Sequence, residues 1–526
     1  MHHDLALWRK IAHEESHMSA VPFETLVRHR LADEVGRYTK EAPNTVALLY
    51  PSPYAAGMSS LGYQRIYRAI FDEPGFACER VFLDDEAEQD ILAQTRPRSY
   101  ETHRPLEEFP IVAVSVAYEL EIAGLVSMLD AAKIPARRAD RDERHPFVLA
   151  GGPLTFSNPL PLAGIVDAVI VGESEELIGP VLHVIQRESA GAMSAAAKGE
   201  ARARTLERLA AIPHVFVPAH HGATLPTVAK VDNALLPAWS PIRTPHAVLS
   251  NMFLIETERG CSRTCTYCVM RRSTNGGMRL VSMEQLLSTI PEDARRVGLV
   301  GAAVSDHPRI TQIVNALADR GAEVGLSSLR PDRLNDDFVA ALKRGGYKTL
   351  TTAMDGPSDR MRESLERRAR VKHLIRAAEL AKAHKMDRLK LYLMVGLPGE
   401  TDADIDECIA FSTELSRIVP LSLGIAPFCA KRNTPLDGKP FAGVKVVQER
   451  LERLRRGLKG RVDVRSTSAK WAWVEYVLAQ GAEAEGLAVV DAVRQGGRFA
   501  DYKRAFASVP APSMARPRRS LAIAQI

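Results

Sequence analysis

Short runs of apolar residues alternate with amphipathic helical segments along most of the chain. In the N-terminal part these runs lie at 46–51, 111–117, 147–153 and 168–173, and helical patterns such as 61–71 separate most of them. Strands that are apolar throughout and alternate with helices are typical of a parallel sheet covered on both faces. We therefore predict a doubly wound parallel α/β domain.

A second series of strand and helix patterns begins near residue 252. Its six apolar runs lie at 253–258, 297–303, 323–329, 348–355, 389–396 and 421–428. Six strand–helix repeats predict a partial (β/α)6 TIM barrel, whose functional side chains lie at the C-terminal strand ends. The predicted order along the chain is a helical leader at 1–40, the first α/β domain at 41–190, a connector with a hairpin at 191–245, the barrel at 246–445, a small helical C-terminal region at 446–508 and a flexible tail at 509–526.

Composition narrows the class of protein. Of the 526 residues, 46% are hydrophobic and 25% charged, which is typical of a globular chain. Basic residues number 69 against 64 acidic ones, and so weak an excess makes nucleic acid an unlikely partner. The sequence contains no apolar run of the roughly 18 to 20 residues that span a bilayer, and its start lacks the order of a signal peptide. We therefore expect no membrane span and a cytoplasmic location.

Three of the six cysteines fall within eight positions. Cys261, Cys265 and Cys268 follow the first barrel strand with the spacing C-x3-C-x2-C. Thiolates are soft ligands that suit zinc or iron–sulfur clusters. Three thiolates on a four-iron cluster leave one iron open for a substrate or cofactor, whereas a zinc knuckle with a distant fourth ligand is the structural alternative.

This motif, with Tyr267 before its last cysteine, resembles the cluster loop of radical S-adenosylmethionine (SAM) enzymes, and the resemblance extends over about 246–445. It implies that Cys261, Cys265 and Cys268 hold a [4Fe–4S] cluster and that SAM chelates the open iron. Electron transfer then cleaves the sulfonium and yields a 5′-deoxyadenosyl radical. On the same analogy, Tyr267 packs near the adenine.

Later strand ends resemble the same family, with departures. The family's Gly-Gly-Glu-like turn, which binds the methionine amine, corresponds here to Gly301-Ala302-Ala303, and Asp306 is a candidate for the missing acid. The other residues that the resemblance implies at the cofactor are Arg330 for the methionine carboxylate, Asp355 where family members often carry Glu-Ser, and Gly396 and Pro398 of the adenine motif. Cys429 follows the sixth strand, where its thiol either meets the substrate as a catalytic group or packs in the core.

Residues 46–180 resemble the Rossmann-like cobalamin-binding-type domain that precedes many radical SAM barrels. The resemblance implies cofactor contacts at six positions: Tyr54, Gly57, Ser115, Gly151, Gly152 and Gly172. Tyr54, however, stands where cobalt-ligating domains carry histidine, and a phenol is a poor replacement for a neutral imidazole. Either cobalamin binds without a protein ligand or the domain keeps the fold alone, in which case the glycines merely turn the chain.

The two-domain order predicts an enzyme that uses the radical for cobalamin-dependent methylation of an unactivated carbon. The alternative is radical coupling, cyclisation or rearrangement without cobalamin. Less favoured are a non-catalytic iron–sulfur protein and a tRNA-modifying enzyme, because the latter class needs three further N-terminal cysteines and this region has only Cys78. The expected partners are a small-molecule or lipid substrate and a reducing protein such as flavodoxin or ferredoxin.

Overall fold

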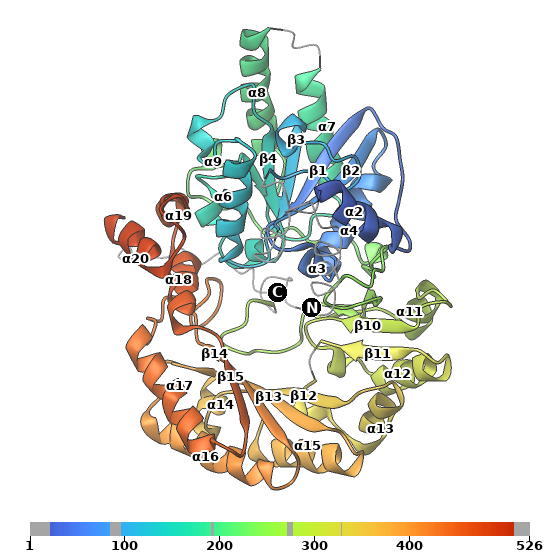
Figure 1. Ribbon diagram of the computed structural model, residues 1–526, viewed down its shortest axis with the longest axis vertical. Helices are drawn as coiled ribbons and strands as arrows, with labels where there is room; N and C mark the ends of the chain where they lie inside the picture. The colour runs from blue at the N-terminus through green and yellow to red at the C-terminus, as the bar shows by residue number, and fades with distance from the viewer. Residues whose placement is uncertain (1–21, 85–95, 191–193, 271–276, 328, 510–526) are drawn as a thin grey trace, which may run out of the picture. The chain divides into compact units, whose positions relative to one another are not determined.

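The computed structural model describes residues 22–84, 96–190, 194–270, 277–327 and 329–509. Contacts divide the chain into two compact units, which are labelled by element in Figure 1. Unit 1 comprises Met1–Met252 and Gly481–Ile526, and unit 2 comprises Phe253–Gln480. The chain therefore leaves unit 1, forms all of unit 2, and returns.

Unit 1 is built on a six-stranded sheet of order β2-β1-β3-β4-β5-β6. Its strands are β1 (Asn44–Tyr50), β2 (Phe76–Phe82), β3 (Ile111–Ser115), β4 (Phe147–Gly151), β5 (Ala168–Ile170) and β6 (Val215–Phe216). All neighbours pair in parallel except β5 and β6, which are antiparallel. The predicted doubly wound sheet is confirmed, with an antiparallel edge strand added.

The central strands of this sheet are covered on both faces. Every residue of β2 is buried, and so are the last five of β1, because helices pack on each side. The helices of this part of the chain are α2 (Phe23–Ala32), α3 (Tyr54–Gly57), α4 (Leu61–Asp72), α6 (Glu121–Ala131), α7 (Ile178–Ser189), α8 (Ala195–Ala210) and α9 (Pro218–His221). Ser60 begins α4 by accepting a hydrogen bond from the Tyr63 amide, which is a standard N-cap.

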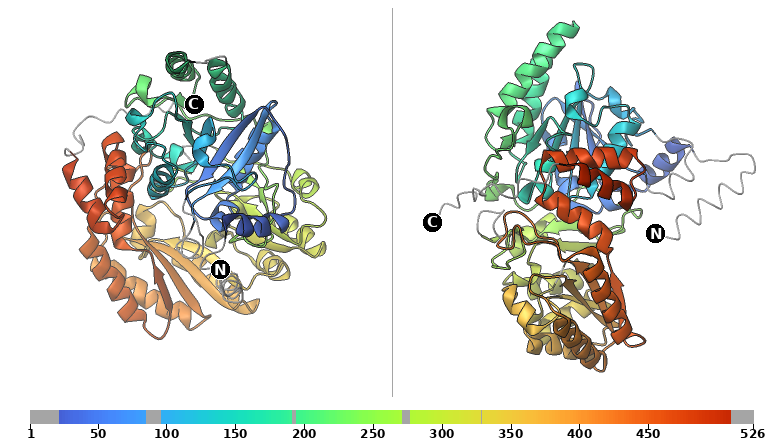
Figure 2. Two further views of the ribbon diagram at one scale, coloured as in Figure 1. Left: turned by 45° about the horizontal axis from the view of Figure 1, so that its top comes forward. Right: turned by 90° about the vertical axis from the view of Figure 1, so that its left-hand side faces the viewer.

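The segment predicted as a connector belongs largely to unit 1. Its alanine- and arginine-rich part forms α8, which packs against α7 (Figure 2). The predicted hairpin is not formed: β6 pairs with β5, the short helix α9 follows, and Ala229 makes a parallel bridge to Gly172. Pro218 explains the difference, because proline fits the first turn of a helix and cannot donate to a strand ladder.

The C-terminal helices α19 (Glu483–Arg494) and α20 (Phe499–Ser508) return to unit 1. Helix α19 packs on α6 and is tied to it by the ion pair Arg494–Asp130, with an N–O distance of 2.8 Å. Helix α19 also packs on the 3-10 turn Leu160–Leu162, where Gly486 is required because a Cβ would collide with the backbone carbonyl of Pro161. A helical C-terminus was predicted; its place in unit 1 was not.

Unit 2 contains two parallel sheets with the orders β11-β10-β7 and β12-β13-β14-β15. The strands are β7 (Phe253–Glu256), β10 (Arg296–Val300), β11 (Glu323–Leu326), β12 (Thr349–Asp355), β13 (Arg388–Val395), β14 (Leu421–Pro427) and β15 (Asp463–Ser466). A parallel bridge between Leu329 and Thr352 joins the two sheets. All six predicted barrel strands are confirmed, and β15 adds a strand within the region expected to be helical.

The helices of unit 2 follow its strands in the alternation expected of a partial barrel (Figure 1). They are α11 (Met283–Thr289), α12 (Ile310–Asp319), α13 (Asp336–Arg344), α14 (Asp359–Ser364), α15 (Val371–Ala383), α16 (Asp402–Ser416), α17 (Val444–Leu458) and α18 (Ala469–Gln480). A short antiparallel ladder between β8 (Glu258–Arg259) and β9 (Arg279–Leu280) follows β7. Among the described residues, no helix combines the length and apolar character that a membrane crossing requires.

Strands β12 and β13 are each buried on one face only. Alternate residues of β12 are buried, and those between them are half-buried. Successive side chains of a strand point to opposite faces, so one face of β12 packs under helices and the other faces the barrel interior. Ala353 and Asp355 share that inner face, and this register brings Asp355 into the candidate site.

Candidate active site

The three clustered cysteines line one cavity of about 170 Å³ in unit 2. The described residues around it come from the cysteine loop, the ends of β10, β11 and β12 and the segment after α14: Cys261, Arg263, Cys265, Tyr267, Cys268, Ala302, Ala303, Arg330, Ala353, Asp355 and Arg367. Eight of the eleven side chains are polar or contain sulfur. The cavity therefore offers a set of soft ligands surrounded by arginine and aspartate.

The cysteine loop is fixed from both sides. Gly260 turns the chain with φ +82°, a conformation that favours glycine, directly before Cys261. Further along, the Thr266 amide donates to the Leu365 carbonyl and the Leu436 amide donates to the Thr266 carbonyl, both at 3.2 Å. The loop is thereby attached to the segments that follow α14 and β14.

Each cysteine has a polar N–H group beside it that favours its thiolate form. The backbone amide of Arg263 lowers the pKa of Cys261, that of Met270 lowers the pKa of Cys268, and the Arg367 guanidinium lowers the pKa of Cys265. Such donors stabilise thiolates and tune the clusters that thiolates hold. In the protein without metal, burial raises the pKa of all three thiols, so metal binding would displace protons.

Arg367 connects the cysteine loop to β12. Its guanidinium is ion-paired with Asp355, which also accepts a hydrogen bond from the Tyr267 hydroxyl. Asp355 has a φ of +63°, an uncommon conformation for a residue with a side chain. Burial raises the pKa of Asp355, whereas Arg367 lowers it. Tyr267, predicted to pack near adenine, therefore has its hydroxyl directed to a neighbouring carboxylate.

Arg330 lines the cavity as predicted, with Asp306 behind it. The two form an ion pair with N–O distances of 2.5 and 2.6 Å, and Arg263 and Arg333 also contact the Asp306 carboxylate. Asp306 is 3% exposed and is not among the cavity's lining residues. Its role is to hold three arginines, so it does not replace the missing acid of the turn after β10.

The turn Gly301-Ala302-Ala303 lies against the buried carboxylate of Glu258, a residue that was not predicted to belong to the site. A Cβ at Gly301 would collide with the carboxylate of Glu258, which accepts a hydrogen bond from the Ala303 amide at 2.9 Å. Burial raises the pKa of Glu258 to about 7. Ala302 lines the cavity, whereas Gly301 provides the room that Glu258 occupies.

The glycine motif after β13 forms a compact turn. Glu400 accepts hydrogen bonds from the amides of Gly396 (2.9 Å) and Leu397 (3.2 Å) and is ion-paired with Arg450 at 2.8 Å. Gly396 has a φ of +81°, and its Cα faces Val447 and Ala442. Neither Gly396 nor Pro398 lies among the described residues that line the cysteine cavity, so their contact with adenine stays a prediction.

Cys429, the predicted catalytic thiol, also lies outside the lining of that cavity as described. Its sulfur donates to the Ala472 carbonyl at 3.1 Å, at the beginning of α18. This contact gives the thiol a packing role in unit 2. A role toward substrate stays a prediction.

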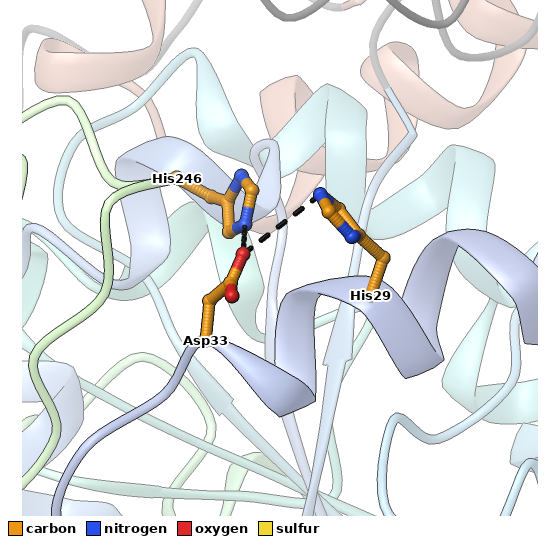
Figure 3. Close-up of side chains that lie close together, drawn as sticks. All are labelled: His29, Asp33 and His246. Carbon is orange, nitrogen blue, oxygen red and sulfur yellow. Dashed lines mark hydrogen bonds and ion pairs between the residues drawn. The ribbon is translucent and has the colours of Figure 1, made fainter. Parts of the chain in front are cut away.

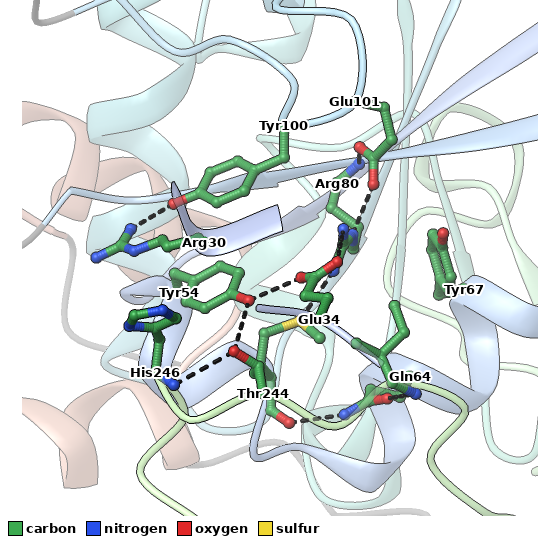
Figure 4. Close-up of polar contacts among 12 residues, drawn as sticks. Arg30, Glu34, Tyr54, Gln64, Tyr67, Arg80, Tyr100, Glu101, Thr244 and His246 are labelled. Atoms are coloured by element: carbon green, nitrogen blue, oxygen red, sulfur yellow. Dashed lines mark hydrogen bonds and ion pairs between the residues drawn. The ribbon is translucent and has the colours of Figure 1, made fainter. Parts of the chain in front are cut away.

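In unit 1 the structure places Tyr54 in the interior and not at an open strand end (Figure 4). Its hydroxyl donates to Glu34 at 2.7 Å, and its ring stacks on Tyr100 at a centroid distance of 5.1 Å. Glu34 in turn accepts two bonds from Arg80, at 2.7 and 2.9 Å. Burial and the Glu34 carboxylate raise the pKa of Tyr54 well above 10, so the phenol stays neutral. The fully buried Tyr54 is not available as a cobalt ligand.

The other predicted cobalamin contacts are close-packed. Gly57 lies against the Phe82 ring, and Gly172, with a φ of +103°, lies against the backbone of Ala229. Gly152 (φ +102°) approaches the Val116 backbone and the Ser115 hydroxyl, while Gly151 ends β4. Tight packing and chain reversal account for glycine at 57, 152 and 172 without a bound cofactor.

Sequence reasoning missed Arg367 and Glu258. Arg367 lies in the segment after α14, but its neighbours Arg368 and Arg370 carry the same charge. Nothing in the one-dimensional pattern distinguishes the arginine that meets Cys265. Glu258 is the first residue of β8, two positions after β7 ends, and the sequence offered only the glycine at 301 as a sign of its close neighbour.

Comparison with known families and proteins agrees with this geometry. Residues 62–218 match the family described as "Radical SAM proteins, N-terminal", and residues 255–412 match the "Radical SAM superfamily". The second match includes all three clustered cysteines.

The chain is also similar to individual proteins. An uncharacterized protein of Methanocaldococcus jannaschii is 26% identical over 404 residues, covering 75% of this chain and 80% of the relative. An uncharacterized methyltransferase of Pyrococcus horikoshii is 22% identical over 323 residues, covering 58% of this chain and 66% of the relative. Among solved structures, the cobalamin-dependent SAM radical enzyme OxsB aligns with a TM-score of 0.48 at 13% identity, covering 80% of this chain and 58% of that one.

Proposed function

We propose that the chain, which matches the radical SAM superfamily over residues 255–412, cleaves SAM reductively at a [4Fe–4S] cluster held by Cys261, Cys265 and Cys268. The observation that carries the proposal is that three cysteine sulfurs line one cavity together with Arg263, Arg330 and Arg367. Among the described lining residues there is no fourth cysteine and no histidine. The cluster, once bound, would supply a one-electron reductive cleavage of SAM that yields methionine and a 5′-deoxyadenosyl radical.

The chain's own residues bind and orient the reactants. Arg330, held by Asp306, presents a guanidinium to the cavity that suits the methionine carboxylate of SAM. Arg367 places a positive charge beside Cys265 and thereby offsets the negative charge of a thiolate cluster. The ion pair with Asp355 keeps Arg367 in this position, and the Tyr267 hydroxyl donates a hydrogen bond to the Asp355 carboxylate. Asp306 and Asp355 are thus positioning residues.

The test is anaerobic reconstitution of the full chain with iron and sulfide, followed by addition of dithionite and SAM. We expect about four irons per chain and the formation of 5′-deoxyadenosine, detected by mass spectrometry. Cys265→Ser should abolish both, whereas Cys408→Ala, a change at a buried cysteine of α16, should keep both. A chain that binds its iron yet produces no deoxyadenosine, or that holds zinc instead, contradicts the proposal.

For the step after radical formation we propose methylation of a substrate carbon. The 5′-deoxyadenosyl radical takes the hydrogen atom from that carbon, a second SAM supplies the methyl group and leaves as S-adenosylhomocysteine, and the reductant supplies a second electron. The support is the similarity to a protein named as an uncharacterized methyltransferase, with 22% identity. Tyr54 is buried and hydrogen-bonded to Glu34, so it cannot act as an axial ligand to the cobalt of cobalamin. Equilibrium dialysis with hydroxocobalamin tests the remaining option: binding supports cobalamin held without a protein ligand, and no binding favours coupling, cyclisation or rearrangement.

We further propose that a reduced flavodoxin or ferredoxin delivers the electron and that the substrate is a small molecule or lipid. A second cavity of about 650 Å³ in unit 2 shares Arg263 with the cysteine cavity, and Arg333, Arg362, Arg368 and Arg370 also line it. Asp332, Asp359, Glu363 and Glu366 line the same cavity, so its arginines exceed its carboxylates by one. Replacing dithionite by reduced flavodoxin or ferredoxin should sustain deoxyadenosine formation, and no turnover with either protein contradicts this part.

A further inference from the structure

Two histidines and an aspartate converge in unit 1, far in sequence from the cysteine motif (Figure 3). His29 and Asp33 are one helical turn apart, at the end of α2 and just after it, and His246 comes from the segment that precedes unit 2. The Nε2 atoms of His246 and His29 lie 2.7 and 3.8 Å from the same Asp33 oxygen, Oδ2. One ligand atom from each residue lies within 4.8 Å of the other two.

The surrounding structure holds His246 in this position. Its side chain is only 10% exposed, and its backbone amide donates to the Thr244 hydroxyl at 3.2 Å. Thr244 is buried beside the Tyr54 hydroxyl, at 3.4 Å. The His246 ring meets the His29 ring edge-on, with centroids 5.1 Å apart. One ligand is therefore preorganised by the interior of unit 1.

The other two ligands are open to solvent. His29 is 43% exposed and Asp33 is 41% exposed, so an ion has access and water has room to complete its coordination. Residues four apart on a helix lie on the same face, which lets His29 and Asp33 act together. The nearby Glu34 is not part of the set, because its carboxylate binds Arg80 and Tyr54.

We propose that His29, Asp33 and His246 form a binding site for one divalent transition-metal ion of the zinc class. Two imidazole nitrogens and one carboxylate oxygen suit such ions, which bind them at about 2.0–2.2 Å, whereas calcium and magnesium prefer oxygen ligands. Bonds of that length around one ion place the ligand atoms about 3.4 Å apart, close to the observed separations. The site is independent of the cysteine motif and of the proposed function.

The ion would join two segments that are 213 residues apart in sequence, α2 and the segment at His246. Because the three ligands come together only in the folded chain, the ion binds the folded state and stabilises it by mass action. The role is structural: it fastens the first described helix to the stretch that leads into unit 2.

The experiment uses the full chain with its iron–sulfur cluster already reconstituted, so that the cysteines do not take up zinc. Zn²⁺ is the probe, and bound zinc is measured by equilibrium dialysis with elemental analysis, together with the thermal midpoint. We expect one zinc per chain and a higher midpoint with zinc. His29→Gln and Asp33→Asn should weaken binding at least tenfold and remove the shift in midpoint.

His220→Gln is the matched control, because His220 is an exposed histidine of unit 1 on α9, outside the cluster. It should bind zinc as the unaltered chain does. His29 is partly exposed, so its substitution leaves the fold in place, and circular dichroism verifies this. Equal zinc binding by the His29→Gln, Asp33→Asn and His220→Gln chains, or no zinc binding by the unaltered chain, overturns the proposal and leaves Asp33 and His246 as a plain ion pair.

Discussion

The two units differ at the same topological position, the segment after the first strand of a parallel α/β series. One segment lines a cavity and the other is buried. In unit 2 this loop presents three cysteines to a cavity. In unit 1 the loop after β1 carries Tyr54, which is fully buried and hydrogen-bonded to Glu34. Functional groups of such folds are expected at the C-terminal strand ends. The fold therefore supplies the position of a site, and the side chains decide whether that position is open to a ligand.

The electrostatics of the two loops differ in the same way. Arg80 is 0% exposed and its partners Glu34 and Glu101 belong to unit 1, so its charge is satisfied internally. Arg367 is also paired with a carboxylate, Asp355, but it lines the cavity beside Cys265, whose pKa it lowers. Arg80 thus stabilises the interior of unit 1, whereas Arg367 lies beside a cysteine in the cavity of unit 2.

The largest expected effect on stability comes from removing Arg80. Arg80→Met leaves the Glu34 and Glu101 carboxylates buried without their cation, which should cost about 3–5 kcal/mol of the free energy of unfolding. Urea unfolding followed by circular dichroism measures this. The control Arg98→Met removes a partly exposed ion pair with Glu24 and should cost less than about 1 kcal/mol. Similar losses in the two variants would break the contrast between the loops.

The next effect is a pH dependence in unit 2. Glu258 ionises near pH 7 in the folded chain and near 4.5 when unfolded, so the folded state binds the extra proton between these values. Stability should therefore fall as pH rises from 4.5 to 7, by about 3 kcal/mol, and then level off. Glu258→Gln should remove this part of the slope in thermal unfolding from pH 5 to 8. The exposed Glu363→Gln control should keep it, and an unchanged slope in Glu258→Gln would contradict the assignment.

A smaller effect is expected at the cluster. Arg367→Gln removes a positive donor from Cys265 and should make the midpoint potential of the reconstituted cluster more negative, by about 60 mV for each tenfold change in the equilibrium constant. A redox titration followed by electron paramagnetic resonance measures the shift. Arg368→Gln removes an exposed charge from the next position and should leave the potential nearly unchanged. Equal shifts would mean that net charge alone matters.

The smallest effect is at Tyr54. Tyr54→Phe removes the hydrogen bond to Glu34, but Arg80 still satisfies that carboxylate, so the loss should be about 1 kcal/mol. Chemical unfolding measures it, and Tyr392→Phe, at a 43% exposed tyrosine, serves as the control with no expected loss. If Tyr54→Phe were neutral and changed hydroxocobalamin binding, the loop of unit 1 would be open to a ligand after all.

The sequence by itself determined the two α/β series, the six barrel strands and the cysteine motif. Apolar runs report burial directly, and the ligands of the motif are neighbours in the chain, so both are visible in one dimension. It also placed Arg330 and Asp355 at strand ends, where parallel strands gather side chains at one edge.

Only the tertiary structure decided which charged groups meet. That Arg367 and not Arg368 contacts Cys265, that Asp306 binds three arginines, and that Glu258 fills the space at Gly301 depend on contacts between segments distant in sequence. The same holds for the return of α19 to unit 1 and for the approach of His246 to His29. Such pairings arise from packing in three dimensions, so local patterns of polar and apolar residues cannot predict them.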